Sequence, residues 1–297
     1  MEPYSPTDLY TGQFPFFWCS DFIRDSRHQS HQMKKVRILL YNQIGDYPVE
    51  AMEDGLNPES LVEQLEYLRV QGFHIVGLDE ALAYMEGETN LPENSLSITF
   101  DGGYADVHTN VLPTLEKYGI KAAFFIAPSL IGNSRVIRDH ALPCMEWEQV
   151  RSLAEKGMVI GHYGCNGRTF KRVPKKEIEE DISISKPLFE KHLGVQPIYY
   201  AMNEGTPEPE AIKVLQENGY IALLTKSPTN QNPNIYAIGR IQVDDEDINI
   251  FLTKISETYL LFKDSPYWKY IRKHGLAKAF HHLSEFYNSI CGRQNSP

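Results

Sequence analysis

Short apolar segments alternate with longer amphipathic segments over most of the chain, and this alternation constrains the fold more than any other feature. Residues 36–41, 96–100 and 122–127 are rich in Leu, Ile, Val and Phe and have the length of buried strands. The segments between such strands carry apolar residues at helical spacing. Strands that alternate with helices pair in parallel through right-handed crossovers. We therefore predict an α/β fold with a parallel sheet surrounded by helices.

The composition narrows the class of protein. The chain has 297 residues, of which 42% are hydrophobic, enough to fill the core of one large α/β domain. Its net charge of −10 argues against nucleic acid or an anionic membrane surface as a partner. No apolar run approaches the roughly 18 residues of a membrane span. The chain shows no secretory signal and no Cys-x-x-Cys spacing, so we predict a cytoplasmic protein with reduced thiols. The sequence does not indicate an oligomeric state.

The pattern divides the chain into three parts. Residues 1–35 mix aromatic and polar residues without a period, and we predict an irregular arm there. Residues 36–262 contain the alternating strands and helices of the main domain. Residues 263–297 continue a helical pattern rich in aromatic residues, which predicts a C-terminal helical extension.

The segment 96–106 carries the strongest candidate site. Asp101 follows the apolar strand directly, which places a carboxylate at the carboxyl end of a parallel strand, where barrels carry their chemistry. Gly102 and Gly103 allow a sharp turn with positive φ. A general base at position 101 is one interpretation. Capping of the following turn by the Asp101 side chain is the structural alternative.

Residues 99–104 read Thr-Phe-Asp-Gly-Gly-Tyr and resemble the Thr-Phe-Asp-Asp-Gly-Tyr motif of the NodB-type polysaccharide deacetylases. The resemblance covers roughly residues 36–245. It implies an incomplete (β/α) barrel with about seven parallel strands and a metal-dependent reaction that removes N-acetyl groups from sugars. In that family the first aspartate is the base and the second binds a divalent metal. The corresponding residues here are Asp101 and Gly102.

A second region resembles the family's paired-histidine motif. Residues 160–170 read Ile-Gly-His-Tyr-Gly-Cys-Asn-Gly-Arg-Thr-Phe. An alignment without gaps places Tyr163 and Gly167 at the two histidine positions, whereas a shift of one residue aligns His162 with the first. The positions that the resemblance assigns to metal ligands therefore hold Gly102, Tyr163 and Gly167. No metal cofactor is expected from such residues.

The replaced ligands matter because, in the reaction that the resemblance implies, the metal contributes most of the rate acceleration. A bound metal lowers the pKa of water from about 15.7 to about 7. This change makes the formation of hydroxide easier by roughly 12 kcal/mol. A general base alone contributes roughly 3–5 kcal/mol. A rearranged zinc site built from Asp101, His162 and Cys165 is the alternative.

Two functions remain open at this point. The first is a pseudoenzyme, a catalytically impaired family member that binds an N-acetylated glycan or a partner protein through the former cleft. The second is an active N-deacetylase with a non-standard site, in which Asp101 is the base and His162 a further catalytic residue. The residues expected to bind the glycan are Tyr104, Tyr163, Tyr200 and Asn203.

Overall fold

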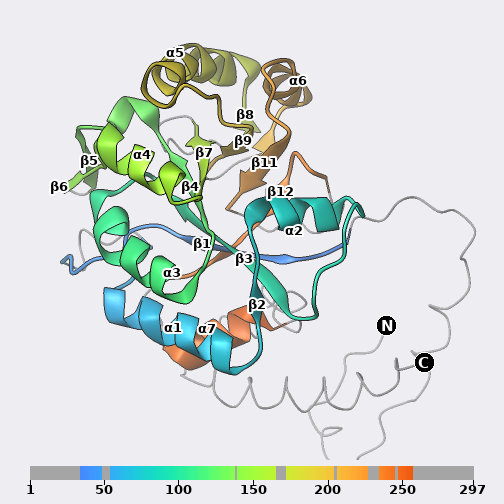
Figure 1. The fold of residues 1–297 in the computed structure, drawn as a ribbon. Coiled ribbons are helices and arrows are strands. Elements are labelled where there is room, and N and C mark those ends of the chain that lie inside the picture. Colours follow the sequence, from blue (N-terminus) through green and yellow to red (C-terminus); the bar gives the residue numbers. More distant parts are fainter. Residues whose placement is uncertain are drawn as a thin grey trace, which may run out of the picture. The chain divides into compact units, whose positions relative to one another are not determined.

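A computed structural model describes residues 34–48, 54–137, 139–164, 172–203, 206–226, 234–244 and 247–256 (Figure 1). Almost all of the predicted arm 1–35 and the whole of the predicted extension 263–297 lie outside these ranges. Among the described residues, no helix has the length and the apolar character needed to cross a bilayer.

The described residues form a parallel sheet that follows the predicted pattern. The strands neighbour one another in the order β12-β11-β9-β7-β4-β3-β1-β13, and β2 pairs with β3 outside this path. The strands from β1 to β11 are β1 (Arg37–Tyr41), β2 (His74–Ile75), β3 (Ser95–Asp101), β4 (Ala123–Ile126), β7 (Val159–Tyr163), β9 (Tyr199–Ala201) and β11 (Ala222–Thr225).

One short segment joins the two edges of this sheet. β12 (Ile238–Gly239) pairs with β11, and β13 (Ile241–Gln242) pairs with β1 at the other edge. The sheet is thereby a nearly closed barrel of eight strands, which confirms the predicted barrel. The sequence predicts one strand over 235–243, whereas the structure divides this stretch between two partners. Arg240 lies at the division.

Helices surround the barrel, as the amphipathic segments predict. They are α1 (Pro58–Val70), α2 (Leu78–Met85), α3 (Leu112–Tyr118), α4 (Trp147–Glu155), α5 (Lys175–Leu193), α6 (Pro209–Glu217) and α7 (Ile248–Ile255). Their ends follow local chemistry. The side chain of Asn57 accepts a hydrogen bond from the backbone of Ser60 at the start of α1. Gly119 and Gly194 adopt left-handed conformations that end α3 and α5.

Shorter elements lie between the main ones. A π-helical turn, Val107–Val111, precedes α3, and a 3₁₀ turn, Pro128–Leu130, follows β4. The stretch 128–143 is predicted as a loop, yet it contains the antiparallel hairpin β5 (Ser134–Ile137) and β6 (His140–Pro143). A further pair joins β8 (Arg172–Val173) to β10 (Thr206–Pro207).

The register of the strands decides which side chains face the inside of the barrel. Asp101 lies opposite Phe125, which in turn lies opposite Gly161. Phe125 packs in a cluster whose members come from β1, β4, β7, β9, β11 and β12. Residues from strands all around the sheet can meet only inside the barrel. Because side chains alternate along a strand, the neighbours Phe100 and Phe124 point outward.

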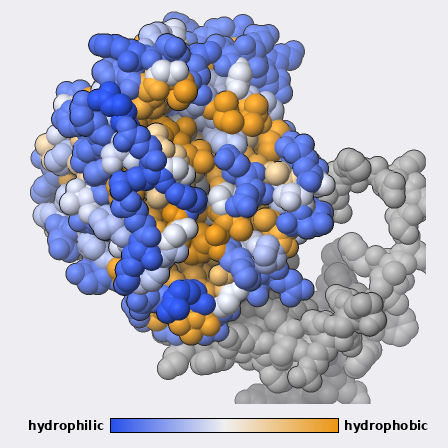
Figure 2. Space-filling model, in the orientation of Figure 1, coloured by the Kyte–Doolittle hydropathy of each residue, from blue (hydrophilic) through white to orange (hydrophobic). Residues whose placement is uncertain are grey.

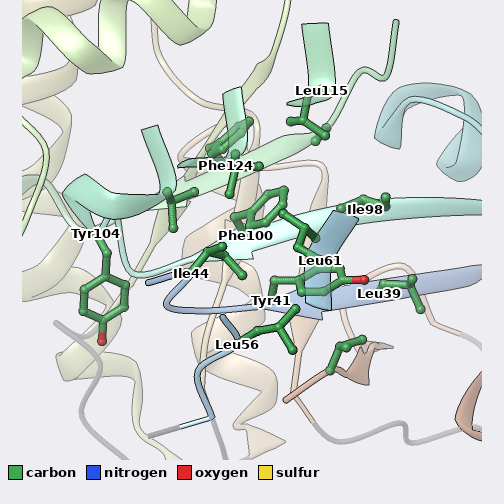
Figure 3. Close-up of a cluster of buried hydrophobic side chains, with 14 of the residues drawn as sticks. Leu39, Tyr41, Ile44, Leu56, Leu61, Ile98, Phe100, Tyr104, Leu115 and Phe124 are labelled. Atoms are coloured by element: carbon green, nitrogen blue, oxygen red, sulfur yellow. The ribbon is translucent and has the colours of Figure 1, made fainter. Parts of the chain in front are cut away.

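The outward face of the sheet is covered by helices. Figure 3 shows the rings of Tyr41, Phe100 and Phe124 stacked beside Leu61 of α1 and Leu115 of α3. The ring centroids are 5.3 Å apart for Tyr41 and Phe100, and 5.1 Å apart for Phe100 and Phe124. A separate cluster covers β9 and β11 with α5 and α6.

α2 lies against the amino ends of the strands. The Lys34 backbone N–H, just before β1, donates to the Met85 carbonyl at the end of α2. Leu78, Leu82 and Met85 of α2 pack into the interior cluster. Figure 2 shows mixed hydrophilic and apolar surface on the side of the barrel that Figure 1 faces. With α2 at the amino ends, the polar interior residues described next lie at the opposite, carboxyl end.

Candidate binding site at the carboxyl end of the barrel

The centre of the site is a buried ion pair between Asp101 and Arg240. Nη1 of Arg240 donates to Oδ1 of Asp101 at 2.6 Å, and Nη2 donates to Oδ2 at 2.6 Å. The Arg240 side chain is 0% exposed and that of Asp101 is 2% exposed. Two parallel, charge-assisted hydrogen bonds are the strongest form of this pairing. The pair joins the end of β3 to the segment that closes the barrel.

Several strands hold the Arg240 side chain in place. Its Nε donates to the Thr225 carbonyl at 3.3 Å, and Nη1 lies 3.3 Å from the Thr99 hydroxyl. The guanidinium carbon lies 5.4 Å from the centre of the Phe125 ring. That ring occupies the space beside Gly161, where a Cβ atom would lie 2.4 Å from it. Glycine at position 161 therefore makes room for the ring that supports Arg240.

The burial and the charges of the pair determine whether the Asp101 carboxyl is ionised. Burial raises the pKa of the Asp101 carboxyl, and the charge and hydrogen bonds of Arg240 oppose this rise. A guanidinium has only donors, so both of its bonds require acceptor oxygens. The ionised carboxylate provides two such oxygens, and each has a cationic partner. Each oxygen keeps a further lone pair, but protonation of Asp101 would remove the charge that strengthens this pairing.

A second cation, Arg135 of β5, lies between two aromatic rings. Its guanidinium carbon is 5.7 Å from the centre of the Tyr104 ring and 5.6 Å from that of the Tyr163 ring. Nη1 lies 3.5 Å from the Tyr104 hydroxyl. Burial and the charge of Asp101 raise the pKa of Tyr163, so its phenol is neutral. Both tyrosines are nearly fully buried. These contacts bring Arg135, Tyr104 and Tyr163 to the same end of the barrel as Asp101.

The described residues at the expected ligand positions do not fit a divalent metal. Gly102 has no side chain, and a Cβ atom there would lie 2.6 Å from the Tyr104 ring. Tyr163 presents a neutral phenol, and both oxygens of Asp101 are bound by Arg240. In the part of the chain that the structure describes, no three His, Cys, Asp or Glu side chains are grouped so that they could hold a metal. The third position, Gly167, lies outside the described residues.

His162 is on the outward face of β7. It lies opposite Ile126 and Tyr200 in the register, one residue out of phase with Gly161. Its Nδ1 is 2.7 Å from the Tyr220 hydroxyl, and its Nε2 is 3.0 Å from Oδ2 of Asp181. The structure therefore does not bring His162 to Asp101. The zinc site considered from Asp101, His162 and Cys165 is not formed by the first two, and Cys165 lies outside the described residues.

Tyr200 belongs to the same outward network. Its hydroxyl donates to Oδ2 of Asp181 at 2.8 Å, and its ring packs against His162. A Cβ atom on Gly164 would lie 1.6 Å from the Tyr200 hydroxyl oxygen, so glycine is required there. Tyr200 is fully buried and does not reach Asp101. Asn203, in contrast, follows the carboxyl end of β9, where its carbonyl accepts from the Lys226 backbone.

Two residues of the site are missing from the sequence-based prediction. Arg240 had a recognisable signal, because a charged residue inside an apolar strand must find a buried partner. Arg135 had none, since its contact with Tyr104 and Tyr163 depends on a hairpin within a stretch predicted as a loop.

Comparison with known proteins agrees with this fold. Residues 88–223 match the model of the polysaccharide deacetylase family. Over this stretch, slightly less than half of its length, the chain is similar to the polysaccharide deacetylase family. The putative polysaccharide deacetylase YxkH of Bacillus subtilis is 26% identical over 186 residues, which are 60% of this chain and 62% of YxkH. The poly-beta-1,6-N-acetyl-D-glucosamine N-deacetylase of Escherichia coli K12 is 28% identical over 122 residues, 35% of this chain and 18% of that enzyme. The matches thus span less than two thirds of these relatives.

Solved structures of deacetylases share the barrel. IcaB from Ammonifex degensii superposes with a TM-score of 0.61 at 23% identity, over 71% of this chain and 93% of that one. The Streptococcus pyogenes deacetylase PplD gives a TM-score of 0.60 at 18% identity, over 72% and 94% of the two chains. At this identity the similarity establishes the fold alone. The predicted NodB-type barrel is confirmed.

The ion pair predicts a large and specific effect on stability. Replacing Arg240→Met leaves the Asp101 carboxylate buried without its cation, so we expect the free energy of unfolding at neutral pH to fall by roughly 3–5 kcal/mol. Urea denaturation measures this change. In the control Arg151→Met, an exposed ion pair with Glu148 and a hydrogen bond to the His192 carbonyl are lost, and the change should stay below about 1.5 kcal/mol. Equal losses in the two variants would contradict the assigned role of Arg240.

Gly102 provides a test of the turn at the vacant ligand position. Its φ is +94°, and a methyl group there would meet the Tyr104 ring. Gly119 has φ +66° with no atom within 4 Å of an added Cβ, so Gly119→Ala carries only the conformational cost of about 1–2 kcal/mol. We expect Gly102→Ala to lose a further 1–3 kcal/mol, roughly, from overpacking. Thermal or urea unfolding of both variants measures the difference, and equal losses would exclude a tightly packed Tyr104.

Proposed function

We propose that this protein, which is similar to the polysaccharide deacetylase family, binds a glycan at the carboxyl end of its barrel and is impaired in deacetylation. The observation that carries the proposal is the bidentate pairing of Asp101 with Arg240. The family resemblance assigns the base to position 101. In this chain both oxygens of that carboxylate are engaged by a buried guanidinium.

The chemistry of the remaining groups supports impaired catalysis. A general base must lie within about 2.6–3.2 Å of the proton that it removes, with an oxygen able to accept it. At the ligand positions, Gly102 and Tyr163 offer no anionic donor for a metal that would activate water. A general base without a metal lowers the barrier by roughly 3–5 kcal/mol. A metal makes the formation of hydroxide from its bound water easier by roughly 12 kcal/mol.

Binding of a glycan is supported by the polar groups that the same end of the barrel presents. Arg135 and Asn203 are only partly buried. The backbone N–H of Lys226 donates to the Asn203 carbonyl, and its ammonium lies 2.5 Å from Asp54. The E. coli relative is named for action on a polymer of N-acetylglucosamine. An N-acetylated oligosaccharide is therefore the first ligand to test.

The alternative is an active deacetylase with a non-standard site. The retention of Asp101 at the carboxyl end of β3 favours it, since a carboxylate in this position is placed for chemistry in a barrel. Such an enzyme would need Asp101 to accept a proton despite its pairing with Arg240. This alternative predicts turnover that depends on Asp101.

An assay of acetate release separates the two functions. The protein is incubated with N-acetylglucosamine oligomers linked β-1,4 or β-1,6, with added zinc or with chelator, and binding is followed by calorimetry. We expect measurable binding and no acetate above the protein-free background in either condition. Acetate release that disappears in Asp101→Asn and persists in the exposed control Arg151→Met would establish the alternative. Absence of binding to any glycan on an array would contradict the proposed function itself.

A further inference from the structure

We propose that the glycan recognised at this site carries a carboxylate group, as in a hexuronic acid, and that Arg135 binds it. This inference rests on the proposed function and specifies its ligand. It comes from the state of the Arg135 guanidinium, which is placed at the site without an anionic partner among the described residues.

The hydrogen bonding of Arg135 is incomplete. Nη1 approaches the Tyr104 hydroxyl at 3.5 Å, a long contact, while Nη2 is buried and has no hydrogen-bond partner among the described residues. A buried donor on a charged group costs several kcal/mol when it is left unsatisfied. The Arg135 side chain as a whole is only partly buried, so an acceptor can approach it from solvent. An oxygen from a ligand would complete the set.

The charges around Arg135 leave it uncompensated. Arg240 is neutralised by Asp101, and Lys226 is neutralised by Asp54 at 2.5 Å. The groups that act on Arg135 most strongly are Tyr104, Tyr163 and Cys144, and burial raises the pKa of Tyr163 and of Cys144, which keeps both neutral. Of the described cations Arg135, Arg240 and Lys226, only Arg135 has no ion-pair partner among the described residues.

The nearby acid Asp106 does not fill this role. Its carboxylate accepts from the backbone N–H of Ile44 at 2.8 Å and from that of Val107 at 2.7 Å. Burial raises the pKa of Asp106 to about 6, with these hydrogen bonds opposing the rise. Asp106 therefore stabilises the local turn, and these hydrogen bonds do not involve Arg135.

The geometry of Arg135 suits a carboxylate. The rings of Tyr104 and Tyr163, at 5.7 and 5.6 Å, restrict the guanidinium and reduce the entropy lost on binding. A planar guanidinium matches a planar carboxylate through two parallel hydrogen bonds. A single guanidinium without an ion-pair partner supplies one counter-charge, which a monoanionic carboxylate matches. A uronic acid residue combines this group with the sugar hydroxyls that polar residues such as Asn203 can bind.

Calorimetry with two oligosaccharides of equal length tests the inference. The probes are tetragalacturonate and the neutral chitotetraose, with galacturonate monomer and acetate as small-carboxylate controls. We expect tetragalacturonate to bind at least 10-fold, roughly, more tightly than chitotetraose, because hydrogen bonds to charged groups are stronger than those between neutral groups. The Arg135→Gln variant should lose this preference, so that its affinities for the two tetrasaccharides become equal.

Matched variants keep the result interpretable. Arg135→Lys retains the charge without the planar fork and should keep only part of the preference, and its folding is checked by thermal unfolding. Arg151→Gln removes an exposed arginine elsewhere and should leave both affinities unchanged. Equal affinity for the two tetrasaccharides, or a preference that survives in Arg135→Gln, overturns the inference but leaves the proposed function intact. Tighter binding of a sulfated tetrasaccharide overturns the carboxylate assignment, as does equal binding of acetate. Failure of every glycan to bind contradicts both.

Discussion

The ion pair between Asp101 and Arg240 is the interaction on which the rest of the structure depends. The two residues are 139 positions apart in the chain, yet both are buried and each satisfies the other. Arg240 stands where β12 ends and β13 begins, so the same residue marks the closure of the barrel and reaches into its centre. A buried charge without its partner is strongly unfavourable. Strand pairing therefore binds the segment 238–242 to the edge of the sheet at β1, and the ion pair binds the same segment to the interior of the barrel.

The same interaction shapes what the site can do. Phe125 supports the guanidinium from one strand, and Gly161 makes room for Phe125 from the next. These interior residues stabilise the ion pair. The described positions at which the family resemblance places metal ligands hold Gly102 and the neutral phenol of Tyr163. The barrel is thus similar to that of known deacetylases, whereas the groups at its carboxyl end are a paired carboxylate, cations and aromatic rings. On this basis we propose that the site binds a glycan and does not activate water.

Much of the fold could be predicted from local pattern, and the failures have physical causes. Residues 78–85 have the apolar spacing and flanking turns that predict a helix, and α2 has these bounds because both signals are local. The strand 235–243 looked continuous, since nothing local reveals that its two halves pair with opposite edges. The hairpin inside 128–143 has short, largely exposed strands without an apolar pattern.

The site was predicted less completely than the fold. Asp101 could be found because a carboxylate directly follows a buried strand. The expected position of Tyr200 at the cleft differs from the structure, which buries it against Asp181. In a strand that is buried on both faces, both sets of alternate side chains are apolar. The sequence therefore does not show which set faces the inside of the barrel. The same ambiguity applied to His162 and Tyr163, and only the register shows that Tyr163 faces inward.

The most direct test of this account is an experimental structure of crystals soaked in zinc, with anomalous diffraction recorded at the zinc edge. The account predicts that Arg240 bonds to both oxygens of Asp101 and that no anomalous peak lies within coordinating distance of that carboxylate. A zinc ion coordinated by Asp101, with Arg240 displaced, would contradict it.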